Sequence, residues 1–216
     1  NTVSNLSSTR ALRDVTEKHG GIYQASAVGE VNVVELMKKN KAVIGGEGNG
    51  GIIYPSSHYG RDSLVGVALF LTHLAEQQIS VRELSDSYPS YFMSKNKIQL
   101  TPQINVDAIL IEMQEKYVDE NITTIDGVKI DFADNWVHLR KSNTEPIIRI
   151  YTEAKSQEIA DTLALKYMPL IYGEWSDPDT PLQIIKTARI AGNQDTGRVV
   201  IPVPRKVFPM ILKNGF

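Results

Sequence analysis

The sequence lacks cysteine altogether and carries no marked excess of charge of either sign. The absence of cysteine excludes disulfide scaffolds, zinc sites with thiolate ligands and a cysteine nucleophile, and it fits a reducing compartment. The formal net charge of -2 argues against a general electrostatic affinity for nucleic acid or acidic membranes. Hydrophobic residues make up 42% and charged residues 22% of the 216 residues, which is typical of a globular protein with one or two domains.

Long apolar runs are also missing. No stretch approaches the roughly 20 apolar residues that a helix needs to span a bilayer. The first residues, Asn1–Asn5, include neither a basic segment nor the apolar region of a signal peptide. We therefore expect a cytoplasmic protein with neither a membrane nor a nucleic acid as partner. Because the first residue is not Met, we also expect the chain to begin inside a longer protein.

Helix and strand signals alternate over residues 1–92, and this alternation is typical of an α/β domain. The pattern predicts helices over residues 8–18 and 31–39 and strands over residues 22–25, 41–44 and 52–54. Asp62 can cap a further helix, whose apolar side chains cover most of its circumference. We expect that helix to be buried, because a helix that is apolar on all sides is usually a core helix.

Residues 93–172 group several strands between two helices, which predicts an α+β domain with its helices on one face of the sheet. Strands are expected over residues 97–101, 122–125, 127–132, 136–139 and 147–152, and helices over residues 105–117 and 156–167. Residues 173–216 form a tail that we leave without a fold. Val199–Val203 could form one strand there, but Pro202 and Pro204 argue against it.

The glycine-rich segment Gly46–Gly51 matches the G-x-G-x-x-G pattern of dinucleotide sites. Such a site requires a helix to begin at the glycines, so that its amides meet the pyrophosphate. A short β-branched segment that ends at Pro55 follows instead, which disfavours a dinucleotide site. A plain hairpin turn remains open, because glycine and asparagine suit tight turns. A sugar-binding loop is equally open, since Glu47 and Asn49 can exchange hydrogen bonds with hydroxyl groups.

The strongest local signal is the sequence R-K-S-N-T-E-P between two expected strands. Ser142, Asn143 and Thr144 supply two hydroxyl groups and an amide in succession, and their backbone amides can form an anion-binding nest. Arg140 can bind phosphate through two parallel hydrogen bonds, which lysine cannot do. Arg149 is close enough in sequence to return to the same place across the turn. A turn with solvated charges is the alternative, but the two flanking arginines favour a phosphate site.

Both segments resemble motifs of the α-D-phosphohexomutase superfamily, which includes phosphoglucomutases, phosphomannomutases and phosphoglucosamine mutases. The third domain of that family carries G-E-x-[SN]-G, similar to Gly46–Gly50, and the fourth carries R-x-S-[GN]-T-x-P, similar to Arg140–Pro146. Val28-Gly29 and Arg61-Asp62 resemble segments that flank the sugar loop. The order and the separation of the two motifs fit as well.

The resemblance implies a division of the chain and a role for each loop. Residues 1–92 would be an α/β domain with a mixed sheet and flanking helices, like the third domain of the family. Residues 93–172 would be an α+β domain with an antiparallel sheet of the TATA-binding-protein type, like the fourth. The implied ligands of the sugar hydroxyls are Glu47, Gly48 and Asn49. The implied ligands of the phosphate that is not transferred are Arg140, Ser142, Asn143, Thr144 and Arg149.

Two family motifs are absent from the sequence: the phosphoserine loop T-A-S-H-N-P and the magnesium loop D-x-D-x-D-R. The resemblance therefore implies a Mg²⁺-dependent parent enzyme, an isomerase that moves phosphate between C1 and C6 of a hexose through a phosphoserine and a bisphosphate. In this chain we expect no catalytic residue, no bound metal or cofactor and no activity alone. Its expected partners are a phosphorylated hexose and the missing amino-terminal domains of the same protein. A non-enzymatic module that binds phosphosugars or nucleotide sugars remains the alternative.

Overall fold

The computed structural model describes residues 1–100, 104–142, 144–172, 182–189 and 196–203. The chain divides into two compact units, Asn1–Tyr91 and Phe92–Phe216. Each unit has a sheet and a hydrophobic core of its own.

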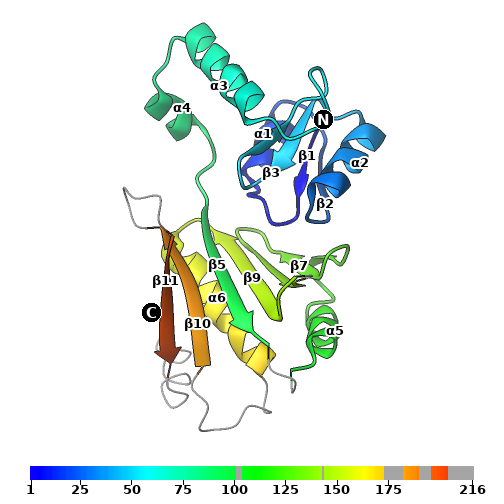
Figure 1. Cartoon of the computed structure of the whole chain (residues 1–216), viewed down its shortest axis with the longest axis vertical. Coiled ribbons are helices and arrows are strands. Elements are labelled where there is room, and N and C mark those ends of the chain that lie inside the picture. Colours follow the sequence, from blue (N-terminus) through cyan, green and yellow to red (C-terminus); the bar gives the residue numbers. More distant parts are fainter. Residues whose placement is uncertain (101–103, 143, 173–181, 190–195, 204–216) are drawn as a thin grey trace. The chain divides into compact units, whose positions relative to one another are not determined.

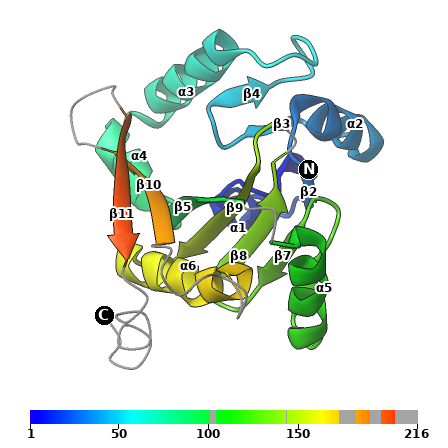
Figure 2. The same cartoon turned by 60° about the horizontal axis from the view of Figure 1, so that its bottom comes forward.

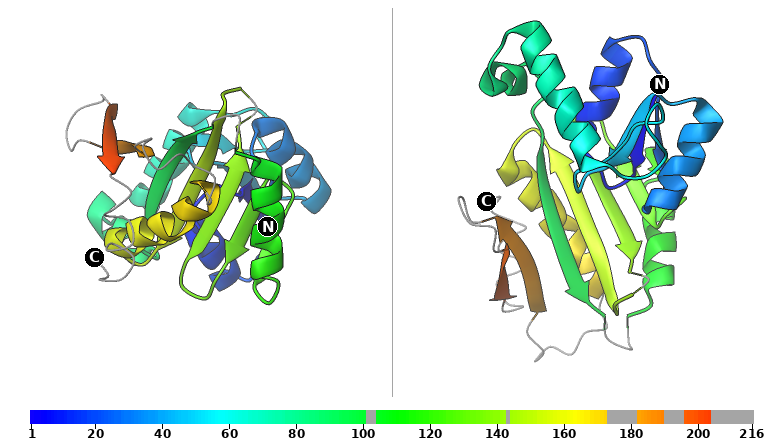
Figure 3. Two further views of the ribbon diagram at one scale, coloured as in Figure 1. Left: turned by 90° about the horizontal axis from the view of Figure 1, so that it is seen from below. Right: turned by 45° about the horizontal axis from the view of Figure 1, so that its top comes forward.

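The first unit contains a four-stranded sheet in the order β2-β1-β3-β4 (Figure 1). Its elements are β1 (Thr2–Asn5), α1 (Ala11–Lys18), β2 (Tyr23–Ser26), α2 (Glu30–Asn40), β3 (Ile44–Glu47), β4 (Gly51–Ile53), α3 (Ser63–Gln77) and α4 (Val81–Ser87). The strands β1, β2 and β3 run parallel, and β4 runs antiparallel to β3. The sheet is therefore mixed, as expected. The connection from β1 to β2 and the connection from β2 to β3 run in opposite directions along the sheet. Because both crossovers are right-handed, α1 and α2 lie on opposite faces (Figures 1 and 3).

The core of this unit lies between the sheet and α2. Val3 of β1 and Ile53 of β4 are buried, and Val33 and Met37 of α2 are buried with them. Val33 and Met37 are four residues apart, so they share one face of the helix. This packing fixes the carboxyl ends of β1 and β3, where the first candidate loop begins.

Helix α3 corrects one expectation. Asp62 caps it as predicted, since its Oδ1 accepts hydrogen bonds from the amides of Leu64 and Val65. The expectation that α3 is buried is wrong, because no residue of the helix is buried. One side of α3 rests on β4, where Gly66 allows a close approach to Ile52. The other side carries Leu64 at 79% exposure. The apolar composition of α3 shows that the helix has an apolar surface, but no described residue covers that surface.

Helix α4 starts immediately after α3 because Ser80 begins a new helix. Its hydroxyl accepts from the Glu83 amide while the Glu83 carboxylate accepts from the Ser80 amide, which is a capping box. By length and composition, no single helix in the described ranges could cross a membrane. The two helices reach the required apolar length only as a pair, and that pair is bent by 95°.

The second unit contains a seven-stranded antiparallel sheet in the order β11-β10-β5-β9-β8-β7-β6 (Figure 2). Its elements are β5 (Phe92–Gln99), α5 (Val106–Lys116), β6 (Asn121–Thr123), β7 (Val128–Asp131), β8 (Trp136–Lys141), β9 (Ile147–Ala154), α6 (Gln157–Tyr172), β10 (Leu182–Arg189) and β11 (Thr196–Val203). Neighbouring strands all pair antiparallel. This arrangement confirms the predicted α+β class.

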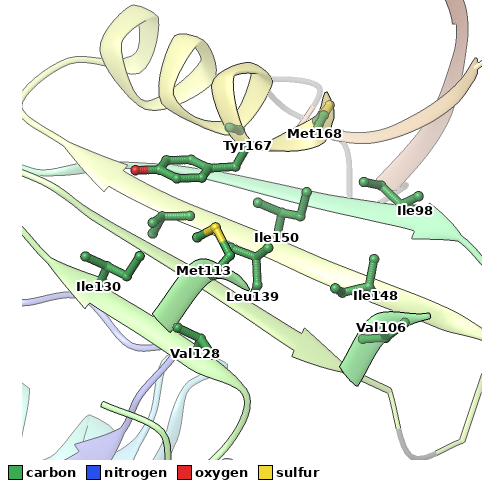
Figure 4. Packing of buried hydrophobic residues seen from close by; sticks show 12 residues of the cluster. Ile98, Val106, Met113, Val128, Ile130, Leu139, Ile148, Ile150, Tyr167 and Met168 are labelled. Carbon is green, nitrogen blue, oxygen red and sulfur yellow. The ribbon is translucent and has the colours of Figure 1, made fainter. Parts of the chain in front are cut away.

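One face of this sheet is apolar and carries both helices. Ile150 of β9 and Leu139 of β8 are buried against Met113 of α5 and Tyr167 of α6 (Figure 4). Successive side chains along a strand point to opposite faces. The residues between these apolar positions, Arg149 among them, therefore lie on the face away from the helices.

The tail that we left without a fold contributes two strands to this sheet. β10 pairs with β5, and β11 pairs with β10 and forms the edge (Figure 3). The strand suggested by Val199–Val203 is present despite Pro202, because an edge strand tolerates the missing amide hydrogen of proline. Pro204 lies outside the described residues.

Candidate functional site

The first candidate loop is the hairpin between β3 and β4. Glu47 ends β3 and pairs with Gly51, and its carbonyl accepts a hydrogen bond from the Gly50 amide at 3.2 Å. Gly46, at φ 156°, lies so close to β4 that a Cβ on it would be 2.2 Å from the carbonyl oxygen of Gly51. Only glycine fits at position 46, so the tight hairpin that presents Glu47 depends on it.

The carboxylate of Glu47 is nearly buried, with 8% of its side chain exposed. Its Oε1 accepts hydrogen bonds from Asn5 Nδ2 at 2.7 Å and from the Gly29 amide at 3.2 Å. Its Oε2 lies 3.7 Å from Nη1 of Arg61. The structure thus brings Glu47 together with Gly29 and Arg61. These two residues belong to the segments Val28-Gly29 and Arg61-Asp62, which resemble family segments that flank the sugar loop.

Arg61 reaches Glu47 because Glu30 holds it in place. The Arg61 Nε donates to Glu30 Oε2 at 2.8 Å, and the Arg61 amide donates to Glu30 Oε1 at 3.2 Å. Glu30 is the first residue of α2, where a negative charge also suits the helix dipole. A guanidinium shared between two carboxylates keeps both of them oriented.

Gly48 and Asn49 form the exposed tip of the hairpin. The Asn49 Oδ1 accepts a hydrogen bond from the Gly51 amide at 3.1 Å, so this oxygen stabilises the turn. The Asn49 Nδ2 has no partner among the described residues and can donate to a ligand. The Gly48 amide is already bound, because it donates to Ser8 Oγ at 3.1 Å.

Two residues near Glu47 escaped the sequence reasoning. Asn5 and Ser8 are 5% and 6% exposed, and both lie in or just after β1. Polar residues directly after a central parallel strand are the signal that could have identified them, because such strand ends gather at one edge of the sheet.

The second candidate loop joins β8 to β9. In this hairpin Arg140 and Arg149 are directly opposite one another across the two strands. Ser142, which follows β8, closes the turn by donating its amide to the Ile147 carbonyl at 3.0 Å. Thr144 is exposed, and Asn143 lies outside the described residues. Because the Ser142 amide is engaged, an anion nest in this loop cannot include it.

Arg140 and Arg149 are cross-strand neighbours on one face of the sheet, and the guanidinium group of each approaches a carboxylate. Arg140 Nη1 lies 3.7 Å from Asp126 Oδ2, and Arg149 Nη2 donates to Glu145 Oε2 at 3.1 Å. The Nε atoms of both arginines are buried, yet neither has a hydrogen-bond partner among the described residues. Opposed like charges are unfavourable, and buried donors without acceptors are rare. An anion with several acceptor oxygens would relieve both costs.

His138 supports this arrangement from the same face of the sheet. Its Nε2 donates to the Asp126 carbonyl at 2.7 Å, which fixes the turn whose carboxylate approaches Arg140. Burial lowers the pKa of His138 to about 4 from its ordinary 6.5. The hydrogen bond to Asp126 acts in the opposite direction, and the charges of Lys129 and Arg140 lower the pKa further. The imidazole is therefore neutral at pH 7.

Both loops present charged and hydrogen-bonding groups. The described residues contain no group of three or more His, Asp or Glu side chains that could hold a metal ion. The hairpin at Glu47 offers a carboxylate oxygen and an amide donor. The hairpin at Arg140 offers two guanidinium groups.

Comparison with known proteins decides the family. The profile described as "Phosphoglucomutase/phosphomannomutase, alpha/beta/alpha domain III" matches residues 1–91. The profile described as "Phosphoglucomutase/phosphomannomutase, C-terminal domain" matches residues 96–168. The chain belongs to this family. It carries the phosphohexomutase domains III and IV, in that order.

Individual relatives agree with this assignment. A phosphoglucosamine/phosphogalactosamine mutase of Sulfurisphaera tokodaii is 36% identical over 174 residues, which are 80% of this chain and 38% of that protein. A phosphoglucomutase/phosphomannomutase of Thermococcus kodakarensis is 36% identical over 159 residues, which are 73% of this chain and 35% of that protein. The structure of parafusin, a phosphoglucomutase of Paramecium, shares the fold with a TM-score of 0.60 at 16% identity, over 79% of this chain and 38% of that one. The chain thus spans little more than a third of these phosphohexomutases.

The first prediction concerns the hairpin at Glu47. Replacing Gly46 by alanine sets a Cβ against the Gly51 carbonyl and should lower the free energy of unfolding of the first unit by about 2 kcal/mol. Gly48→Ala is the matched control, because a Cβ there meets nothing closer than 3.5 Å. Urea unfolding followed by circular dichroism measures both variants. Equal stability of the two would show that the backbone is not tightly constrained at Gly46.

The second prediction concerns His138. The unfolded chain takes up a proton at this histidine below pH 6.5, whereas the folded chain does so only near pH 4. The stability that comes from keeping it neutral is complete above pH 6.5 and is lost as the pH falls towards 4, by up to about 3 kcal/mol. His138→Gln has no titrating group, so it should lose less stability than the wild type between about pH 7.5 and about pH 4.5. Urea midpoints of both proteins at both pH values test this, and parallel losses would contradict it.

Proposed function

We propose that this chain is the substrate-recognition half of a phosphohexomutase and that its second unit binds the phosphate of a hexose phosphate. The observation that carries the proposal is the cross-strand pair of Arg140 and Arg149, whose Nε donors are buried without a described acceptor. A phosphate offers three acceptor oxygens and up to two negative charges. It therefore matches both the unsatisfied donors and the opposed positive charges.

Ser142, Asn143 and Thr144 complete the proposed phosphate ligands, as the resemblance implies. Ser142 and Thr144 follow Arg140 in the same hairpin, so their hydroxyl groups can donate to an anion held by the arginines. The amide of Ser142 is excluded from this role, since it closes the hairpin.

The proposed sugar ligands are Glu47, Gly48 and Asn49. Glu47 keeps one oxygen, Oε2, that accepts no hydrogen bond from a described residue, and Asn49 keeps its Nδ2 donor. A carboxylate oxygen and an amide donor on one hairpin suit adjacent hydroxyl groups of a pyranose ring. Gly48 contributes the absence of a side chain at the exposed tip, which lets the ring approach.

The proposed parent enzyme interconverts hexose 1-phosphate and hexose 6-phosphate through a phosphoserine and a bisphosphate in the cytoplasm. Magnesium, when bound, would stabilise the phosphoryl group in transfer. Its ligands belong to parts of the parent outside this chain. The named relatives differ in sugar, since one is a glucosamine/galactosamine mutase and another a glucose/mannose mutase. We propose phosphorylated hexoses as the substrate class and expect weak binding, without turnover, by this chain alone.

The test of this function is the affinity of Arg140 variants for glucose 1-phosphate, measured by titration calorimetry. Arg140→Ala should weaken binding about 10- to 100-fold, because a hydrogen bond to a charged group contributes about 1.5–3 kcal/mol. Arg140→Lys should lose less, because it keeps the charge but not the planar fork. Arg82→Ala is the control, since that arginine is 91% exposed on α4. Unchanged affinity in both Arg140 variants would remove the phosphate assignment.

We further propose that the exposed face of α3 packs against the rest of the parent protein. The exposed apolar residues Leu64, Val67 and Leu71 follow one another at spacings of three and four, so they form a stripe on one side of the helix. Gly66 holds the opposite side on β4. The parent is expected to supply a partner, because the chain spans only 35–38% of the two curated relatives. A stripe of this kind suits a groove between elements of a neighbouring domain.

The double substitution Val67→Lys and Leu71→Lys tests this contact. In the full-length parent it should lower the thermal midpoint, because two charges enter a buried contact, with a loss of about 2 kcal/mol or more. In this chain alone it should leave the midpoint nearly unchanged and reduce self-association in sedimentation experiments. Thr72→Lys adds a charge to an exposed position of the same helix and serves as control. An unaltered midpoint in the parent would contradict the proposed contact.

A further inference from the structure

A buried polar network connects β1 to the sugar hairpin, and no sequence motif identified it. β1 and β3 are parallel neighbours in which Ser4 is level with Gly46. The next residues, Asn5 and Glu47, therefore end their strands at the same level and on the same side of the sheet. Their side chains meet in a hydrogen bond of 2.7 Å from Asn5 Nδ2 to Glu47 Oε1.

The orientation of the Asn5 side chain is fixed by its other end. Its Oδ1 accepts hydrogen bonds from the Ser7 amide at 3.1 Å and from Ser8 Oγ at 2.9 Å. Both partners are donors to this oxygen, so the amide nitrogen must face Glu47. Among side chains of this length, asparagine has both an oxygen that can accept from Ser7 and Ser8 and a nitrogen that can donate to the Glu47 carboxylate. Aspartate would satisfy the turn equally well but would place a second carboxylate against Glu47.

Ser8 extends the network to the tip of the hairpin. Its hydroxyl donates to Asn5 and accepts from the Gly48 amide at 3.1 Å. The turn after β1 therefore holds the hairpin at two points, the side chain of Glu47 and the backbone of Gly48. Asn5 and Ser8 are both buried, so water competes little for these hydrogen bonds.

This network determines which oxygen of Glu47 can meet a ligand. Oε1 accepts from Asn5 and from the Gly29 amide, and two donors fill the two lone pairs of a carboxylate oxygen. Among the described residues, the Arg61 guanidinium approaches Oε2 to 3.7 Å, which is too long for a hydrogen bond. Oε2 is the remaining acceptor.

We infer that Asn5 and Ser8 are positioning residues for sugar recognition, which direct Oε2 of Glu47 towards the sugar hydroxyl groups and hold the hairpin tip at Gly48 in place. This inference rests on the proposed function for the identity of the ligand. The hydrogen bonds that carry it belong to the ligand-free chain. Neither residue touches the sugar itself.

The decisive variant is Asn5→Asp, which replaces the donor to Glu47 by a carboxylate oxygen of the same size. Two carboxylates in contact share one proton, so the variant should take up a proton above the ordinary carboxyl range of about 4. That proton restores a hydrogen bond to Glu47. Affinity for glucose 1-phosphate should therefore be about tenfold below wild type near pH 8 and recover as the pH falls towards about 5. A residue that only stabilises the fold would give no such recovery.

The comparison set consists of Ser8→Ala and Ser4→Ala. Ser8→Ala breaks the tie to Gly48 but keeps the Asn5–Glu47 contact, so its loss of affinity should be severalfold and independent of pH. Ser4 lies one residue before Asn5 and bonds to the hydroxyl of Tyr23 instead, so Ser4→Ala should bind the sugar phosphate like the wild type. Inorganic phosphate, used as a second probe, should bind all these proteins equally.

Two measurements keep this inference separate from the proposed function. Calorimetry with glucose 1-phosphate gives the affinity against pH, and carbon NMR of the side-chain carboxyl groups follows proton uptake in the ligand-free chain. If the wild type fails to bind glucose 1-phosphate, the proposed function is wrong, and the NMR titration still decides whether Asn5 controls Glu47. A pH-independent loss in Asn5→Asp, or a titration without the additional proton, overturns the inference.

Discussion

Arg140 and Arg149 are cross-strand neighbours in β8 and β9, and the packing of the second unit fixes this register. The antiparallel register sets Arg140 opposite Arg149, and the apolar side chains on the other face bind this register to α5 and α6. A slip by one residue would move both arginines into the core and the isoleucines out of it. The cost of the opposed charges is thus offset by burial on the far side of the same strands.

In the first unit, too, strand pairing places the charged group of the candidate site. That group is the Glu47 carboxylate, and the parallel strands β1 and β3 place Asn5 and Glu47 at one edge of the sheet. Parallel strand ends gather polar side chains without breaking the sheet, because the crossover helices lie on its faces. Glu47 is consequently held by a side-chain amide and a backbone amide instead of by charge alone. This leaves the nearby Arg61 at a distance where its charge acts without filling Oε2.

Sequence patterns predicted the two fold classes and the cap at Asp62, since caps and periodicity are local signals. Sequence patterns failed where the burial or the pairing of a residue depends on contacts with distant parts of the chain. The composition of α3 shows that the helix needs apolar contacts, but composition cannot state whether the contact lies in the same unit. Pro202 argued against a strand that exists, because its cost depends on whether the strand is at the edge. Asn5 was missed for the same reason, since its role appears only when β1 is paired with β3.

Two features of the described residues lack a complete set of partners, and they differ in what can satisfy them. The Nε donors of Arg140 and Arg149 need an acceptor that is small enough to enter a hairpin and negative enough to separate two cations, which an oxyanion provides. The stripe on α3 needs an extended apolar surface, which a small hydrophilic ligand cannot provide. We therefore propose a phosphosugar for the arginine pair and a neighbouring domain for the α3 stripe. Both needs fit the proposed recognition half of a larger enzyme better than a separate binding module, because a separate module would leave the stripe uncovered.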